Sequence, residues 1–123
     1  NAAFDISVIR DATSRCGFDW PTIDFACSML LARRHHDLPE HTLDAVAAAA
    51  GVPLGRHHDA VDDALTCARI TLSMAQRVRA ESLDELVRVS GLAWGRLSPG
   101  TYEPCSPTRA TTVLDADRAP TLF

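Results

Sequence analysis

Two residues five positions apart suggest hydrolytic chemistry. His58 belongs to a polar segment that precedes a run with helical apolar spacing, and Asp63 lies early in that run. A histidine in a loop can approach a water molecule and accept its proton, because its unperturbed pKa lies near neutrality. An aspartate in the first turns of a helix is held more firmly. This arrangement suits metal-assisted hydrolysis, in which carboxylates bind divalent cations and a histidine acts as the general base.

A second carboxylate stands close to the first residue of the chain. Asp5 follows an aromatic residue, Phe4, and precedes a stretch with helical apolar spacing. Acidic residues at the junction of a strand and a helix are common builders of metal sites in α/β folds. Asp5 is therefore a second candidate metal ligand.

Together the two segments resemble the motifs of the DEDDh (DnaQ-like) 3′→5′ exonuclease family, to which the DNA polymerase III epsilon (proofreading) subunit belongs. The family's second motif reads HNAxFD, and residues 1–5, Asn-Ala-Ala-Phe-Asp, match everything after its histidine. The third motif reads HxAxxDA, and it is matched at His58, Ala60, Asp63 and Ala64. Two motifs in the correct order are more specific than either one alone. The resemblance covers roughly residues 1–72.

The resemblance implies a role for each matched residue. Asp5 and Asp63 are the expected metal ligands, His58 is the expected general base, and Asn1 is a candidate substrate contact. The implied cofactors are two divalent cations, Mg²⁺ or Mn²⁺. The implied substrate is the single-stranded 3′ end of DNA or RNA, and the implied setting is proofreading or repair.

A neighbouring pair has the same spacing and needs to be weighed. His57 and Asp62 are also five positions apart, but the residue two positions after His57 is not alanine, so His58 and Asp63 are preferred. Considered singly, His58 and Asp63 could be ordinary features of a helix start, where acids interact favourably with the helix dipole. The second matched motif favours the functional interpretation.

The family's first motif, DxExT, supplies two of its four acids and does not occur in this sequence. Asp24, Asp37 and Asp44, for example, all lack a glutamate two positions later. The strands of the central sheet are expected upstream as well. We therefore expect this chain to be the C-terminal part of the exonuclease domain and to be inactive by itself.

The elements that position these residues are mainly helical. Apolar spacing and end signals predict helices over about 5–16, 25–34, 43–50, 60–79 and 83–89, with one or two short strands at most, one of them near residues 22–24. In the fourth helix the predicted core-facing stripe consists of Val61, Ala64, Leu65, Ala68, Leu72 and Ala75. The resemblance implies that the parent has an RNase H-like α/β fold. The expected organisation is an exonuclease portion over residues 1–79, a helical extension over 80–97 and a proline-rich tail or linker over 98–123.

The alternative to an enzyme is an interaction module. Residues beyond the motif match could tether a polymerase or another replication partner, and the terminal Thr121-Leu122-Phe123 loosely resembles peptides that bind sliding clamps. Apolar surface left open by missing strands could also lead the fragment to form homo-oligomers.

Composition and charge limit the kinds of partner and cellular compartment to be expected, but they do not identify a function. The chain has 123 residues and a net charge of −4, so bulk electrostatics alone would not hold nucleic acid. The run Arg33-Arg34-His35-His36 could contact a phosphate backbone, although a solvated basic helix end is the simpler interpretation. No apolar run is long enough to cross a membrane. The four cysteines show no CxxC spacing, which favours a reducing, cytoplasmic compartment.

Overall fold

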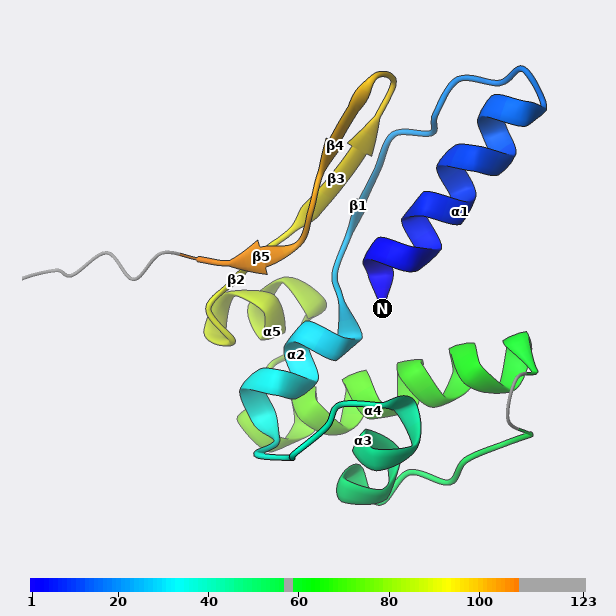
Figure 1. Ribbon diagram of the computed structural model, residues 1–123. Coiled ribbons are helices and arrows are strands. Elements are labelled where there is room, and N and C mark those ends of the chain that lie inside the picture. Colours follow the sequence, from blue (N-terminus) through cyan, green and yellow to red (C-terminus); the bar gives the residue numbers. More distant parts are fainter. Residues whose placement is uncertain (57–58, 109–123) are drawn as a thin grey trace, which may run out of the picture.

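Four helices form a cluster, and a small sheet and a fifth helix extend from it, in a computed structural model that describes residues 1–56 and 59–108 (Figure 1). The helices are α1 (Ala2–Arg15), α2 (Ser28–His35), α3 (Leu43–Ala50), α4 (Ala60–Val78) and α5 (Leu83–Val89). The strands are β1 (Ile23–Phe25), β2 (Leu92–Ala93), β3 (Gly95–Ser98), β4 (Thr101–Glu103) and β5 (Ser106–Pro107). None of the helices in the described ranges combines the length and the apolar character needed to cross a membrane.

The predicted helix ends at α3 and α5 are confirmed. The hydroxyl of Thr42 accepts a hydrogen bond from the backbone N–H of Ala45 at 3.3 Å, and Gly51 ends α3 with a φ of 66°. A left-handed residue at this position is typically glycine, because a Cβ atom is disfavoured there. At α5, Ser82 accepts from the N–H of Glu85 at 3.1 Å, which satisfies one of the free donors of the first turn.

The core lies where α2, α3, α4 and α5 meet. Each helix contributes buried apolar side chains, and β2 adds one more: Leu31, Ala32, Val46, Ala47, Ile70, Met74, Leu86, Val87 and Leu92. Burying a leucine- or methionine-sized side chain contributes about 1.5–3 kcal/mol to folding. Because α5 and β2 share this core with α2–α4, the segment 80–97 packs directly on the part that carries the matched motifs.

The prediction for the buried face of α4 is wrong. The structure buries Thr66, Ile70 and Met74, whereas Val61 and Leu72 of the predicted stripe are 74% and 62% exposed. The helix carries apolar residues on two faces, and periodicity alone does not tell which face a neighbour covers. Within the described residues, α2, α3 and α5 pack on α4 and cover the side that bears Ile70 and Met74.

The expectation of one or two strands at most is also wrong. β3 pairs antiparallel with both β1 and β4, and β2 pairs antiparallel with β5, so the described residues contain two small sheets. Two of these strands, β4 and β5, lie in the stretch that was expected to be a proline-rich tail. Phe25, placed in a helix by its spacing, belongs instead to β1, opposite Gly95. The strands are two to four residues long, which is too short to show a period-two pattern.

Aromatic and charged contacts join α1 to the three-stranded sheet. The guanidinium of Arg10 lies 4.4 Å from the ring centre of Trp20 and 5.3 Å from that of Tyr102. Tyr102 also stacks on Phe25, with ring centres 6.3 Å apart. Cation–π contacts of this kind contribute about 0.5–2 kcal/mol. They hold the first helix, which carries Asp5, in a fixed relation to β1.

Candidate active site

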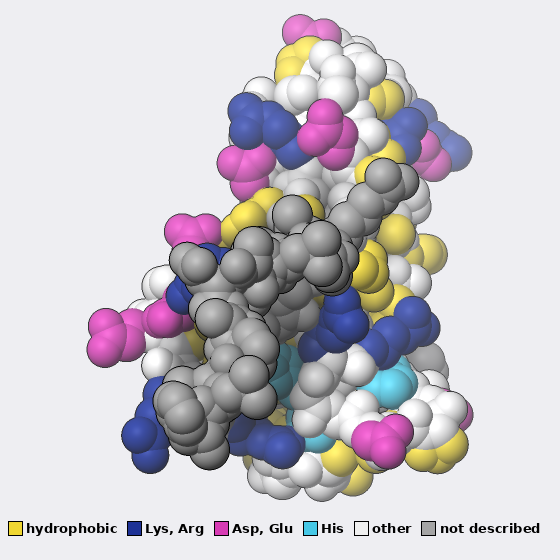
Figure 2. Space-filling view, turned by 90° about the vertical axis from the view of Figure 1, so that its left-hand side faces the viewer, with side chains coloured by type: hydrophobic (Ala, Val, Ile, Leu, Met, Phe, Trp, Pro, Cys, Tyr) yellow, Lys and Arg dark blue, Asp and Glu magenta, His cyan; other side chains and the backbone are white. Residues whose placement is uncertain are grey.

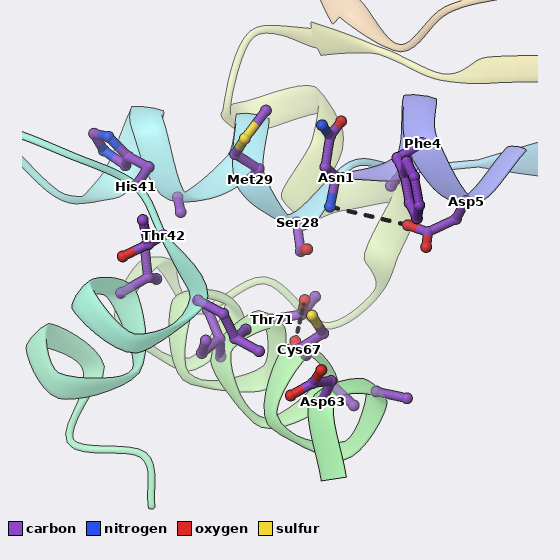
Figure 3. A pocket seen from close by; sticks show the side chains of 18 of the residues that line it. Asn1, Phe4, Asp5, Ser28, Met29, His41, Thr42, Asp63, Cys67 and Thr71 are labelled. Carbon is purple, nitrogen blue, oxygen red and sulfur yellow. Dashed lines mark hydrogen bonds and ion pairs between the residues drawn. The ribbon is translucent and has the colours of Figure 1, made fainter. Parts of the chain in front are cut away.

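A pocket with a volume of about 1070 Å³ lies between the first turns of α1 and α4 (Figure 3). Its walls come from α1, from α2 and the residues just before it, from the start of α3, and from α4. The lining residues are Asn1, Ala2, Phe4, Asp5, Ala26, Ser28, Met29, Ala32, Arg33, His41, Thr42, Leu43, Val46, Ala60, Asp63, Ala64, Cys67, Ala68, Ile70, Thr71 and Leu83. Pockets of this size accept small ligands or the end of a chain. Three of the four predicted site residues, Asn1, Asp5 and Asp63, line it.

Asp5 reaches the pocket from the first turn of α1. Its side chain is 68% exposed, and its Oδ2 lies 3.9 Å from the backbone amine of Asn1. The Asp5 carboxylate is therefore accessible to a cation.

Asp63 enters the same pocket from the first turn of α4, on the opposite wall from Asp5 in Figure 3. Its backbone N–H donates to the carbonyl of Asp59 at 2.9 Å, so the helix fixes its position. Its carboxylate has no hydrogen bond or ion pair with any described residue. The helix holds this side chain in place and leaves its oxygens free for a ligand.

The two neighbouring acids are engaged in holding the local structure. Asp59 caps α4 and accepts hydrogen bonds from the N–H groups of Val61 and Asp62, at 3.1 and 3.3 Å. Asp62 accepts from the backbone N–H of Arg56 at 2.7 Å, and it is not among the residues that line the pocket. The side chain of Asp62 is only 29% exposed because it packs against the preceding loop. These contacts favour Asp63 over Asp62 as the residue available for chemistry.

The predicted general base, His58, lies outside the described residues, as does the alternative, His57. Asp59 and Arg56, on either side of them, are joined by an ion pair of 3.3 Å, and Asp59 lies at the start of α4. Within residues 1–56 and 59–108, no group of three histidine, cysteine, aspartate or glutamate side chains could hold a metal ion. Among the predicted metal ligands, two carboxylates thus share the pocket.

Sequence reasoning did not place Arg33 and His41 at this pocket, yet both line it. Arg33 comes from the last turn of α2 and is exposed, and His41 comes from the loop before α3. The Nε2 of His41 lies 3.1 Å from the carbonyl oxygen of His36, which fixes the imidazole against the end of α2. No sequence signal points to this contact, because it depends on how residues 36–42 fold back over α2.

A protein-family model described as Exonuclease, of the RNase T type, matches residues 1–71. The match contains both carboxylates of the pocket and all of α1, α2 and α3. It fits the expected RNase H-like fold, of which the described residues show a mostly helical part with two small sheets.

One curated relative is a protein of Mycobacterium tuberculosis (strain CDC 1551 / Oshkosh) described as a bifunctional exonuclease/endonuclease. It is 36% identical to this chain over 81 residues, which cover 63% of the chain and 13% of the relative. The chain thus spans about an eighth of the length of that protein. No solved structure matches the chain significantly.

Proposed function

The chain belongs to the RNase T exonuclease family, and from this premise we propose that it forms part of a 3′→5′ exonuclease that hydrolyses phosphodiester bonds at the 3′ end of DNA or RNA. The observation that carries the proposal is that Asp5 and Asp63 line one pocket. They are far apart in the sequence, and each lies in the first turn of a helix. Each also stands at the position that the resemblance assigns to an acid of the site.

The chemistry of these residues fits divalent cations. Mg²⁺ and Mn²⁺ prefer oxygen ligands, and Mg²⁺ is commonly held by one or two carboxylates together with water and substrate phosphates. Asp5 and Asp63 are the residues that would hold such ions. When bound, a pair of cations supplies charge stabilisation at the attacking and leaving oxygens of the scissile phosphate.

The chain's own residues have distinct tasks in this proposal. Asp5 and Asp63 set the position of the reacting end from two opposite walls of the pocket. Asn1 would contact the substrate beside Asp5. His58, which immediately precedes the cap residue Asp59, would take the proton from the attacking water. Asp62, which accepts a hydrogen bond from the N–H of Arg56, would hold the start of the loop before α4.

We also propose that these residues do not complete the site. No DxExT motif occurs in the sequence, so further acids would come from other polypeptide. Exposed apolar side chains support this view: Phe4, which lines the pocket, is 66% exposed, and Leu72, which follows the lining residue Thr71 in α4, is 62% exposed. Single-domain surfaces rarely expose many large apolar groups side by side, and such a face usually packs against something. By itself, the chain would then have no nuclease activity.

The test is a nuclease assay on a 5′-labelled single-stranded oligonucleotide with Mg²⁺ or Mn²⁺. A longer protein that contains this chain would be compared with its Asp63→Ala, Asp5→Asn and His58→Ala variants, and with the 123-residue chain alone. Asp11→Asn serves as the matched control, because Asp11 is an exposed acid of α1 that does not line the pocket. We expect stepwise 3′ shortening that Asp11→Asn retains and that the other three variants and the isolated chain lack. A folded longer protein that shortens neither DNA nor RNA would overturn the proposal.

The alternative is an interaction module in which residues 80–97 and the tail tether a polymerase or another replication partner. In the structure, Leu86 and Val87 of α5 are part of the common core, which leaves Leu83 and Val89, at 43% and 47% exposed, as the apolar groups of this helix that could contact a partner. The terminal segment that resembles a clamp-binding peptide lies outside the described residues. The same assay separates the two proposals, because a tether would leave catalysis independent of Asp63.

A further inference from the structure

The C-terminal end of α2 lies in a group of basic and imidazole side chains that the proposed hydrolysis does not use. We call it the α2 basic cluster, and its members are Arg34, His35, His36, His41 and Arg77. Arg77 Nη1 lies 3.5 Å from His36 Nδ1, and His41 Nε2 lies 3.1 Å from the carbonyl oxygen of His36. Arginine and histidine side chains also gather over the lower half of the face shown in Figure 2. The cluster thus brings together α2, the loop before α3 and the end of α4.

The cluster lacks a carboxylate partner in the part of the chain that the structure describes. Arg34 donates to the carbonyl of Gly91 at 3.5 Å, and Arg77 faces His36, but neither forms an ion pair there. The acids nearest in sequence, Asp37 and Glu40, are exposed and form no ion pair with the cluster. On α5, Glu85 forms an ion pair with Arg88 at 3.4 Å and none with the cluster. Positive charge is therefore concentrated at one place in a chain whose net charge is negative.

The hydrogen bonds of His35 define where it can take up a proton. The hydroxyl of Ser90 donates to the carbonyl of Leu86 at 2.6 Å, so its oxygen accepts from Nε2–H of His35 at 2.7 Å. In neutral His35 the proton thus sits on Nε2, and Nδ1 is the nitrogen that can still be protonated. His41 is arranged in the same way, because its Nε2–H donates to a carbonyl oxygen.

His36 is arranged differently. Arginine can only donate, so Nδ1 of His36 accepts from Arg77, and the proton of the neutral ring lies on Nε2. That Nε2 is buried and has no partner among the described residues. Burial, followed by the charge of Arg77, lowers the pKa of His36, and burial followed by the charge of its neighbours lowers the pKa of His35. An anion beside Arg77 would counteract the effect of the Arg77 charge on the pKa of His35 and His36, and it would favour their protonation.

We propose that the α2 basic cluster binds phosphate groups of a nucleic-acid strand whose end occupies the pocket. Arg33 and His41 line the pocket, and His41 also contacts the carbonyl of His36, so His41 belongs to both the pocket and the cluster. The carbonyl groups at the end of α2 repel an anion, and Arg34 and Arg77 would offset this repulsion. Backbone phosphates are contacted mainly by arginine and lysine, which position a strand without reading its sequence. This inference rests on the proposed nuclease function, since that function explains why a strand enters the pocket.

The test measures binding in the absence of hydrolysis. A short fluorescein-labelled oligothymidylate would be titrated with the chain in EDTA at low ionic strength, and fluorescence anisotropy would report the dissociation constant. Arg77→Ala and Arg34→Ala should each weaken binding about threefold to tenfold, and each should lower the slope of log K against log salt by about 0.7. Arg15→Ala is the matched control, because it removes one exposed arginine at the far end of α1 (Figure 1). Circular dichroism would verify that each variant is folded.

A pH series tests the histidines. Below about pH 6.5 the affinity should rise, because burial lowers the pKa of His35 and its protonation in that range adds a donor beside the phosphate. The variant His35→Gln should flatten this rise, and a rise that stays unchanged in His35→Gln would show that His35 does not contact the phosphate.

Three results would overturn the inference: no binding by the unmodified chain, equal losses in Arg77→Ala and Arg15→Ala, or equally good competition by polyglutamate. A protein that hydrolyses DNA but binds it independently of Arg77 would refute only the phosphate site. A protein that binds through Arg77 but never hydrolyses would refute only the proposed nuclease function.

Discussion

Replacing the adjacent acids Asp62 and Asp63 one at a time should separate stability from chemistry. The carboxylate of Asp62 accepts from the backbone N–H of Arg56 at 2.7 Å and lies 3.6 Å from its guanidinium. A hydrogen bond to a charged group contributes about 1–2 kcal/mol once its exposure is considered. The guanidinium adds little, because the Arg56 side chain is 85% exposed.

We therefore expect Asp62→Ala to destabilise the chain by about 1 kcal/mol, which corresponds to a fall in the unfolding midpoint of about 3–6 °C. Asp63→Ala should change the midpoint by less, because its carboxylate has no partner among the described residues and loses only the favourable effect of the helix dipole. In the nuclease assay the order should be reversed. Asp63→Ala should reduce activity more than about a hundredfold, since even residues that only support a metal ligand contribute about 10–100-fold.

Thermal unfolding followed by circular dichroism and the oligonucleotide assay measure the two effects separately. Asp62→Asn is the control for the hydrogen bond, because its side-chain oxygen can still accept from Arg56 at a smaller cost. If Asp62→Ala abolished activity at a temperature where it is folded, and Asp63→Ala retained activity, the reasoning would be refuted. His57 and Asp62 would then be the catalytic pair.

Three further predictions concern the framework and its response to pH. Gly95→Ala should destabilise the fold by about 1–3 kcal/mol in a denaturant titration, because a Cβ there would clash with the ring of Phe25 and with the backbone nitrogen of Cys105; unchanged stability would contradict this close packing. Ser82→Ala should cost about 1 kcal/mol through loss of the α5 cap, measured in the same way, and Ser82→Asp should restore it. The pKa values of His35 and His36 are lowered in the folded chain, so the unfolded chain binds more protons below about pH 6.5, and stability should fall as pH decreases through that range. Replacing His36 with glutamine should reduce this dependence, and a midpoint that rises on acidification would contradict the stated direction.

The features that the sequence predicted correctly are local ones. Helix ends at Thr42, Gly51 and Ser82 depend on one side chain or one backbone conformation, and each is recognisable from the residue type and its neighbours. The strands could not be found in this way. Ile23 pairs with Leu97, more than seventy positions later, and neither short strand has a pattern of its own. Their stability comes from pairing and packing with distant segments rather than from propensity.

The candidate site also contains some residues that the sequence could predict and others that it could not. The presence of Asp5 and Asp63 at one pocket followed from two motifs in order, because the motifs encode a spatial relation. Arg33 and His41 could not be assigned to that pocket from spacing. Their positions depend on the loop of residues 36–42, whose fold is fixed by contacts such as the one between His41 and the carbonyl of His36.

The exposed apolar residues of α4 suggest where further polypeptide would pack near the candidate site. Val61 and Leu65, which are 74% and 44% exposed, lie on the same helix face as Ala64, which lines the pocket beside Asp63. A polypeptide segment that covered this face would bury these apolar groups and would reach the edge of the pocket at Ala64. Burial of apolar surface and completion of the acidic site would then be one event, because the covering segment that stabilises α4 would also be the one positioned to add carboxylates. Stability and nuclease activity should accordingly rise together as flanking polypeptide is restored.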